Sequence, residues 1–326
     1  MGWWEVNADT LAGSRFVVSP LAETMACLIA LERARAAHPG ERGWLDAHLT
    51  GYRARLAGDP VTALLVRSAL GRNWLADFLT PVPAGEGSPG FEEEVARVRR
   101  TPPETARADL ETTLQRPVPE ALRRPDLPER AARVLEWVWR ETVLPYWPRR
   151  RRVLEADVLA RTDRLTQGGW ADVLGGMRPG TRWLGGNRLQ INTQDRPPQE
   201  LDGVRLMFVP VTRGHGWTAW DTGTPVPRYA LVYPCSGTLA EPDRTAPEAL
   251  GRLLGPARAG VLVLLGTPKS TSQLVALTGQ GLGSVGRHLR ILLEAGLVRR
   301  RRAGRSVLYQ RTAAGETLVE ASAPDG

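Results

Sequence analysis

Residues 281–310 have the sequence GLGSVGRHLRILLEAGLVRRRRAGRSVLYQ, and this stretch decides how the chain is interpreted. Its first six residues place glycines at 281, 283 and 286, which is the G-x-G-x-x-G pattern of dinucleotide-binding enzymes. Its second half carries five arginines and no acidic residue: Arg299, Arg300, Arg301, Arg302 and Arg305. The stretch therefore fits either the phosphate loop of a nicotinamide enzyme or a helix and a basic hairpin that bind DNA.

The residues before this stretch favour a helix, where the enzyme would need a strand. Ser270 and Gln273 form the S-x-x-Q pattern of a capping box, which predicts a short helix over about 271–278. The Gly-Gln-Gly sequence at 279–281 then predicts a turn. Farther upstream, apolar residues at helical spacing predict one amphipathic helix over about 247–265.

The glycines themselves lead into another predicted helix, over about 282–295. It places four apolar side chains on one face, Leu282, Val285, Leu289 and Leu292. Gly296 follows at a C-cap position. Strand-like segments at about 297–301 and 306–311 then predict a basic hairpin, the wing, over about 297–311. The order helix, helix, turn, helix, hairpin is that of a winged helix-turn-helix.

This C-terminal stretch resembles the recognition helix and wing of ArsR/SmtB-type transcriptional regulators, and the resemblance covers about residues 246–320. The matching positions are His288-Leu289, Leu292, Ala295-Gly-Leu-Val298, Arg302, Gly304-Arg305 and Tyr309. Gly286 departs from the family pattern, in which a serine is usual, and the Cys-containing metal motif of the metal-sensing members is missing. In overall layout, the N-terminal region is similar to an uncharacterised domain that actinobacterial members often carry.

We predict that the helix over about 282–295 and the hairpin contact DNA. A helix that presents Ser284, Arg287 and His288 can enter the major groove, and arginines on a hairpin can reach phosphates or the minor groove. His288 could instead pack structurally, and Gln280 could be only a turn residue. The predicted DNA-binding set is Gln280, Ser284, Arg287, His288, Arg290, Arg299, Arg300, Arg301, Arg302, Arg305 and Ser306.

Two other classes of function compete with this interpretation. An NAD(P)-binding oxidoreductase would use Gly281-x-Gly283-x-x-Gly286, but no acidic residue occurs between Glu294 and Glu316, where the ribose-binding acid is expected. A winged-helix protein-interaction module is the other alternative, and the strong charge of the wing argues against it. No catalytic constellation and no metal-ligand spacing is found, so we expect no enzyme, no cofactor and no metal site.

The distribution of charge supports a partner that carries phosphates. The 326 residues carry a net charge of +8. From Ala246 onward there are 11 basic and 5 acidic residues, whereas the 245 residues before it hold 32 and 30. Cys27 and Cys235 match no metal-binding spacing, no apolar run approaches the roughly 18 residues that span a bilayer, and no signal-peptide pattern opens the chain. We therefore expect a cytoplasmic protein without a membrane segment.

The N-terminal region alternates helical and strand-like patterns. Helices are expected over about 19–37, 44–57, 60–79, 91–100, 129–144 and 148–166, with a Pro-rich connection at 101–128. Tryptophans at 44, 74, 137, 139, 147 and 170 are expected to fill the helical core, and Arg149–Arg152 to form a solvated helix start. A strand is expected at 15–18, and closely spaced strand-like runs at 188–192, 204–211, 217–220 and 229–233 predict an antiparallel sheet.

The predicted fold class is α+β, with two domains. Residues 1–240 form a mixed helical and antiparallel-sheet domain with helices in about 19–166 and strands in about 188–233, and residues 246–322 form the winged helix-turn-helix. The expected partner is double-stranded DNA, bound by a homodimer, because a two-fold axis lets each recognition helix occupy one half-site. Candidate roles of the N-terminal domain are the binding of a small-molecule effector, dimerisation, or both.

Overall fold

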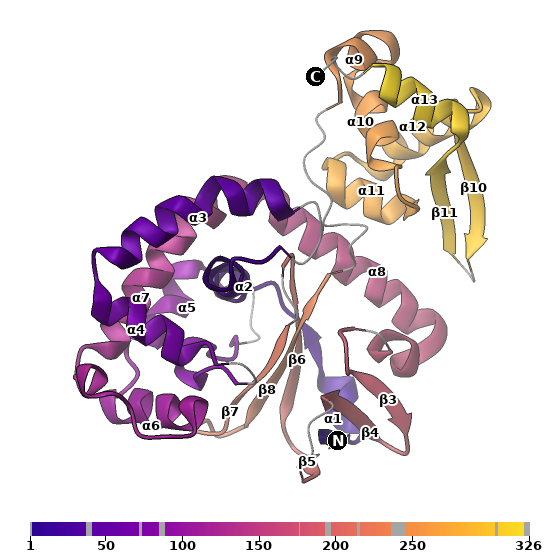
Figure 1. Ribbon diagram of the computed structural model, residues 1–326. Coiled ribbons are helices and arrows are strands. Elements are labelled where there is room, and N and C mark those ends of the chain that lie inside the picture. Colours follow the sequence, from indigo (N-terminus) through magenta and orange to yellow (C-terminus); the bar gives the residue numbers. More distant parts are fainter. Residues whose placement is uncertain are drawn as a thin grey trace. The chain divides into compact units, whose positions relative to one another are not determined.

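The computed structural model describes residues 2–36, 41–71, 74–84, 89–175, 177–192, 197–213, 216–235, 246–303 and 306–322. The backbone divides into two compact units. Unit 1 comprises residues 1–150 and 170–235, and unit 2 comprises residues 151–169 and 236–326. Helix α8 (Trp147–Leu174) thus begins and ends in unit 1, while its central part is grouped with unit 2. Helices and strands both contribute, as predicted for an α+β chain (Figure 1).

Two of the longer helices of unit 1, α2 and α4, begin at a capping residue followed by a proline. The Ser19 hydroxyl accepts a hydrogen bond from the Ala22 N–H at 2.9 Å, and Pro20 takes the first helical position. Asp59 and Pro60 start α4 in the same way. The helices before α8 are α1 (Ala8–Gly13), α2 (Pro20–Arg33), α3 (Arg42–Ala57), α4 (Pro60–Ala69), α5 (Phe91–Arg99), α6 (Pro103–Leu114) and α7 (Leu127–Val138). Single turns are η2 (Asp77–Leu79), η3 (Glu120–Leu122), the π-turn η4 (Trp139–Val143) and η5 (Leu144–Tyr146).

Helix α6 lies inside the segment that was expected to be a Pro-rich connection. Pro103 stands at the first helical position, where a missing N–H costs nothing, and so it starts a helix instead of breaking one. Ala106 and Leu110 are fully buried and hold α6 on the helical core.

Tryptophans fill much of this core, as predicted. Trp139 is buried and stacks on Phe91 with ring centroids 4.7 Å apart. Three further tryptophans of the predicted set pack against the same cluster, at positions 44, 137 and 147, and Trp217 of the sheet does so too. The prediction is wrong for two others: Trp170 packs against Phe16 and Phe208 of the sheet, and Trp74 meets Trp220 of the sheet edge to face.

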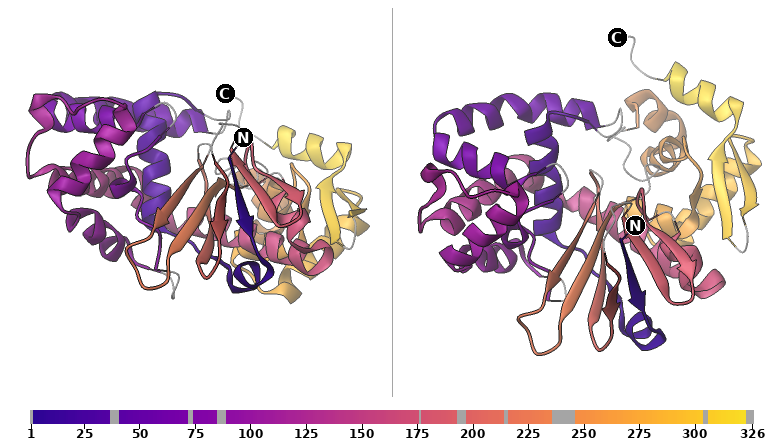
Figure 2. Two further views of the ribbon diagram at one scale, coloured as in Figure 1. Left: turned by 90° about the horizontal axis from the view of Figure 1, so that it is seen from below. Right: turned by 60° about the horizontal axis from the view of Figure 1, so that its bottom comes forward.

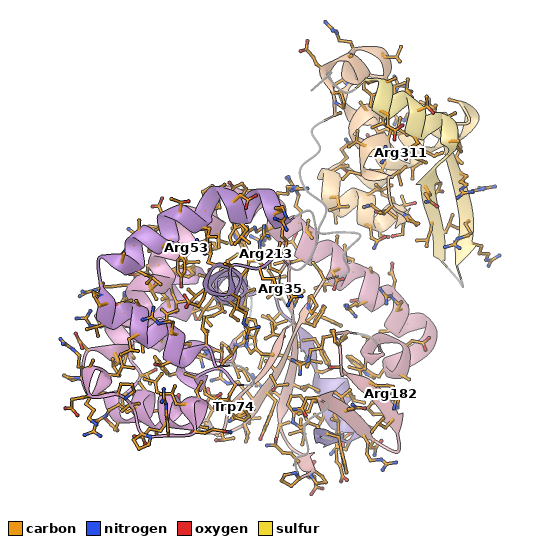
Figure 3. All side chains as sticks on the ribbon, in the orientation of Figure 1. Arg35, Arg53, Trp74, Arg182, Arg213 and Arg311 are labelled. Atoms are coloured by element: carbon orange, nitrogen blue, oxygen red, sulfur yellow. The ribbon has the colours of Figure 1, made fainter. Side chains whose placement is uncertain are left out.

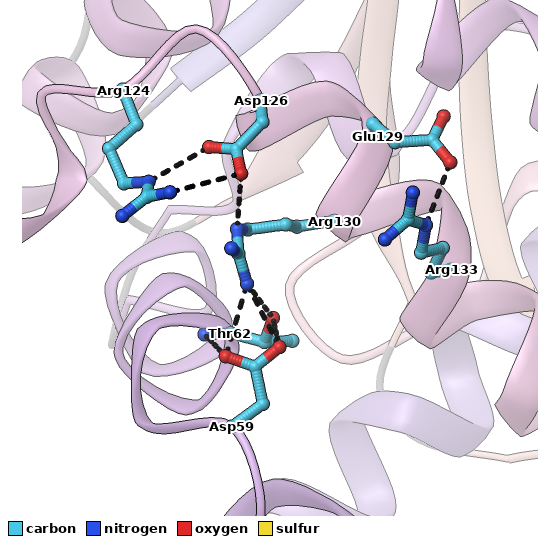
Figure 4. A network of polar contacts seen from close by, with 7 residues as sticks. All are labelled: Asp59, Thr62, Arg124, Asp126, Glu129, Arg130 and Arg133. Carbon is cyan, nitrogen blue, oxygen red and sulfur yellow. Dashed lines mark hydrogen bonds and ion pairs between the residues drawn. The ribbon is translucent and has the colours of Figure 1, made fainter.

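A network of ion pairs joins α4 to α7 (Figure 4). The Arg130 Nη1 donates to both carboxylate oxygens of Asp59, the N-cap of α4, at 3.1 and 2.9 Å. Its Nε donates to Asp126 at 2.8 Å, and Arg124 binds the same carboxylate at 3.0 Å. These groups are partly exposed, so the network orients the two helix starts more than it stabilises the fold.

The main sheet of unit 1 is mixed, and the prediction of an antiparallel sheet is wrong for its centre. Its strands are β2 (Arg15–Phe16), β6 (Arg205–Val211), β7 (Trp217–Asp221) and β8 (Arg228–Pro234), in the order β2-β6-β8-β7. Strands β2, β6 and β8 are parallel, and only β7 is antiparallel to its neighbour. Because β8 inserts between β6 and β7, these two strands are not neighbours although they follow each other in sequence. The nearly continuous burial of β6 and β8 is typical of parallel strands.

A second sheet of unit 1 contains β1 (Gly2–Val6), β3 (Arg182–Gly185), β4 (Arg188–Asn192) and β5 (Gln199–Leu201), in the order β3-β4-β1-β5. Strand β1 pairs antiparallel with β4 and parallel with β5. Figure 2 shows both sheets, with α3–α7 gathered on one side of the main sheet. Helix α2 packs on that sheet, where Ala22 and Ala26 meet Val209 and Ala230.

A buried polar cluster fixes the start of α8 to α2. The Glu23 carboxylate accepts hydrogen bonds from the Thr212 N–H at 2.7 Å and from Arg150 Nη1 at 3.1 Å. Arg150 Nη1 also lies 2.9 Å from the Sγ of Cys27, and burial raises the pKa of that thiol. Arg150 is therefore buried, and the prediction that the Arg149–Arg152 run is simply solvated is wrong at this residue.

Unit 2 adds a compact winged helix to the central part of α8. Its elements are α9 (Glu248–Leu254), α10 (Pro256–Leu264), β9 (Lys269–Ser270), α11 (Thr271–Thr278), α12 (Leu282–Glu294), β10 (Val298–Ala303), β11 (Ser306–Arg311) and α13 (Ala313–Ala321). The single helix predicted over 247–265 is broken at Gly255, where φ is +83°. The three strands form a sheet in the order β10-β11-β9. Among the helices of the described residues, none is long and apolar enough to cross a membrane.

Candidate nucleic-acid interface

Helices α11 and α12 form the helix-turn-helix of unit 2. Both hydrogen bonds of the predicted capping box are present: Gln273 N–H to Ser270 Oγ at 3.2 Å, and Ser270 N–H to Gln273 Oε1 at 2.8 Å. Gly279 ends α11 in the left-handed region, with φ +68°, which favours glycine. The chain then turns directly into α12.

The glycine pattern does not form a dinucleotide-binding loop. Such a loop follows a strand and uses its glycines for a tight turn and for close approach to pyrophosphate. Here the preceding residues 271–278 are helical. Gly281 is the N-cap of α12, and Gly283 and Gly286 lie inside that helix, where an added Cβ would meet no atom within 4 Å. The structural basis of the oxidoreductase alternative is therefore missing.

Helix α12 has one face in the core and one in solvent. Val285, Leu289 and Leu292 are buried, as predicted from their spacing. Leu282 is 64% exposed, so its predicted place on the apolar face is wrong; it lies in the first turn, ahead of the core contacts. Arg287 and Arg290 are exposed. Arg290 lies 4.0 Å from Glu294, whereas Arg287 has no carboxylate partner among the described residues.

Three polar side chains form a ladder along the start of α12. The Ser284 hydroxyl donates to Gln280 Oε1 at 3.2 Å and lies 3.3 Å from His288 Nε2. With the hydroxyl proton engaged by Gln280, Nε2–H of His288 is the donor to Ser284. The ladder spaces Gln280, Ser284 and His288 at successive turns of the helix and fixes the orientation of all three.

His288 acts in this ladder as a neutral residue. Burial lowers its pKa, and the charges of Arg258 and Arg287 lower it further. Its Nδ1 is buried and has no hydrogen-bond partner among the described residues. The contact of Nε2 with Ser284 and the burial of Nδ1 favour the structural role that the sequence left open for His288.

The wing is an antiparallel hairpin of two six-residue strands, β10 and β11. Arg299 pairs with Gln310, Arg300 with Tyr309, Arg301 with Leu308 and Arg302 with Val307. Since side chains alternate across a strand, Arg299 and Arg301 share one face, and Arg300 and Arg302 share the face of the buried Val298. Arg305 lies outside the described residues, and so does the side chain of Ser306.

The four described wing arginines carry uncompensated charge. All four are exposed, and in the part of the chain that the structure describes no carboxylate pairs with any of them. Arg299 Nη2 makes one side-chain hydrogen bond, to Gln310 Oε1 at 3.4 Å. Together with Arg287, they leave five cations of one domain available to an anionic partner.

Three other basic residues of the winged helix make structural contacts. Arg311 (labelled in Figure 3) is buried and lies 3.3 Å from Glu316 of α13. Lys269 of β9 is only 2% exposed, and its ammonium group donates to Thr267. Arg258 donates from Nε to the Leu254 carbonyl at 2.6 Å. The excess of positive charge counted from the sequence therefore overstates the free charge, and what remains is concentrated on α12 and the wing.

Comparison with known protein families identifies this part of the chain. Residues 256–300 match the family model described as "Bacterial regulatory protein, arsR family". The match spans α10, α11, α12 and the start of β10. It confirms the resemblance found in the sequence for the C-terminal domain. No curated protein and no solved structure matches the chain.

Proposed function

Since residues 256–300 form an arsR-type helix-turn-helix, a DNA-binding domain of transcription regulation, we propose that the chain is a transcriptional regulator whose α12 enters the major groove of an operator while the wing contacts the flanking backbone. The observation that carries this proposal is the set of five exposed arginines, without carboxylate partners among the described residues, on α12 and β10.

The exposed surface of α12 suits close approach to base edges. Gly283 and Gly286 are exposed and present no side chain, so the helix backbone can come near the groove floor. Arg287 stands next to them and can bind guanine O6 and N7 with two hydrogen bonds. Gln280 and Ser284, held by their mutual hydrogen bond, are the proposed neighbouring contacts. Arg290 and the wing arginines are proposed as backbone contacts.

We further propose that a homodimer is the functional form and that it acts in the cytoplasm. A symmetric dimer places two copies of α12 on half-sites about one helical turn apart, roughly 34 Å, so the operator is expected to be an inverted repeat.

The test is selection of bound duplexes from a random library, followed by fluorescence anisotropy on the selected site and on random DNA. Arg287→Ala is expected to weaken the selected site by about 1–3 kcal/mol and random DNA much less. Arg252→Ala is the matched control, because Arg252 lies on α9 and pairs with Glu248 at 3.7 Å. Absence of any enriched sequence, or equal effects of both variants, would refute the proposal.

A further inference from the structure

Unit 1 contains a cavity of about 240 Å³ that the DNA-binding role does not use. One wall is α2, whose Ala26, Ile29 and Arg33 line it at the spacing of one helix face. The opposite walls come from residues 71, 74, 75 and 77, and from Gly216 and strand β7, which follows it. This volume is slightly below the range of about 300–1,000 Å³ that is usual for small-molecule sites, so the cavity suits a ligand of one or two rings.

Cations dominate the charge of the lining. Arg33, Arg178 and Arg213 face a single acid, Asp77. Arg178 already binds the Ile191 carbonyl and the Thr181 hydroxyl. Arg33, at the last turn of α2, is exposed and has no partner among the described residues. The cavity therefore has a net positive lining.

Arg213 is the most unusual of these cations. It follows the end of β6, its side chain is 11% exposed, and its Nε has no hydrogen-bond partner among the described residues. Its ion pair with Glu41 is long, 3.7 Å, and its guanidinium lies 4.0 Å from the centre of the Trp44 ring. Burial lowers the pKa of Arg213. A largely desolvated guanidinium with an unused N–H donor can bind an anion by a charge-assisted hydrogen bond.

Aromatic side chains form the other part of the lining. Trp74 and Trp220 meet edge to face, with ring centroids 5.6 Å apart, and Trp217 lies on the same strand as Trp220 (Trp74 and Arg213 are labelled in Figure 3). All three are only half-buried. Gly216 holds this strand entry close to β8: its φ is +69°, and a Cβ there would meet the Val232 carbonyl oxygen. Three indole rings on a fixed strand and loop offer stacking surfaces for a planar ring.

We propose that this cavity binds a small aromatic carboxylate, with its ring among Trp74, Trp217 and Trp220 and its carboxylate on Arg213 and Arg33. A carboxylate matches the planar fork of arginine and supplies the acceptors that Arg213 lacks. The claim that such a ligand is the effector of the regulator rests on the proposed function. The claim that the cavity binds it does not.

The experiment is isothermal titration calorimetry of the full chain with benzoate and 1-naphthoate, and with 1-naphthamide as the neutral isostere. At least one acid is expected to bind at one site per chain, and the amide about tenfold more weakly than 1-naphthoate. Arg33→Gln should weaken binding of the acid about tenfold, because it removes a proposed partner of the carboxylate. Arg33 is exposed, so its replacement leaves the fold intact. Arg35→Gln is the matched control: it removes the same charge from an exposed residue outside the cavity lining.

Trp220→Leu provides a second, independent variant and should weaken the naphthoate more than the benzoate, because it removes stacking surface. Failure of both acids to bind at about 1 mM would overturn the proposal. So would equal binding of acid and amide, or equal effects of Arg33→Gln and Arg35→Gln. DNA binding of the same preparation is measured separately, so a negative calorimetric result leaves the proposed function standing.

Discussion

The wing arginines allow a quantitative test, because the hairpin register divides them into two pairs. Arg299 and Arg301 lie on one face, and Arg300 and Arg302 lie on the other. A duplex beside the wing can meet only one of these faces closely. One double alanine variant should therefore lose two phosphate contacts, and the other should lose few or none.

The expected magnitude follows from counterion release. Each phosphate contact contributes about −0.9 to the slope of log K against log salt. Between 50 and 200 mM salt, a fourfold change, one contact accounts for about a 3.5-fold loss of affinity and two contacts for about twelvefold. The variant on the DNA-facing side should thus make the slope less negative by about 1.8 and bind both operator and random DNA more weakly. The other variant should keep nearly the wild-type slope.

The assay is fluorescence anisotropy with both duplexes at several salt concentrations, for the wild type, the two double variants and Arg252→Ala. Helix α9, which carries Arg252, lies at the end of the winged helix away from the point where β10 ends (Figure 1), so this control should retain the wild-type slope. Thermal unfolding of each protein controls for folding. If both double variants have the wild-type slope, the wing is not on the DNA. If both lose the same amount, the reasoning from strand alternation is wrong.

Three further outcomes are expected. Burial raises the pKa of Glu94 to about 7 from an ordinary value of 4.5, so between these pH values the folded protein holds a proton that the unfolded chain has lost. The free energy of unfolding should therefore fall by about 3 kcal/mol as pH rises through this window, and Glu94→Gln should remove that dependence in urea denaturation at pH 5 and 7.5; the same pH dependence in both proteins would contradict the assignment. Leu289→Ala, in the buried face of α12, should cost about 2–5 kcal/mol of stability, whereas Leu282→Ala should cost less than about 0.5 kcal/mol, and comparable losses would show that both side chains are packed. Titration with NADPH or zinc should leave DNA affinity unchanged; saturable NADPH binding that Gly283→Ala abolishes would restore the oxidoreductase interpretation.

The helix-turn-helix could be predicted because its determinants are local. The capping box at Ser270 and Gln273, the left-handed Gly279 and the spacing of Val285, Leu289 and Leu292 all act within a few residues of each other. The exposure of Leu282 was missed because spacing alone does not say where along a helix the core contacts begin.

The features that the sequence did not predict depend on residues far apart in the chain. Strand β8 separates β6 from β7, and no turn signal carries that information. Arg150 is buried because Glu23, 127 positions earlier, reaches it across unit 1. The cavity likewise combines α2 with β7, so the roles of Arg33 and Arg213 emerge only when the chain is folded.

The burial of Lys269 has a practical consequence for chemical labelling. It is the only lysine in the sequence, and both cysteines, Cys27 and Cys235, are buried as well. Lysine-directed dyes and cross-linkers therefore meet no exposed lysine on the folded protein, and maleimides meet no exposed thiol. A single cysteine introduced at an exposed position, such as Arg252→Cys on α9, would carry a unique fluorophore or spin label without prior removal of the native thiols.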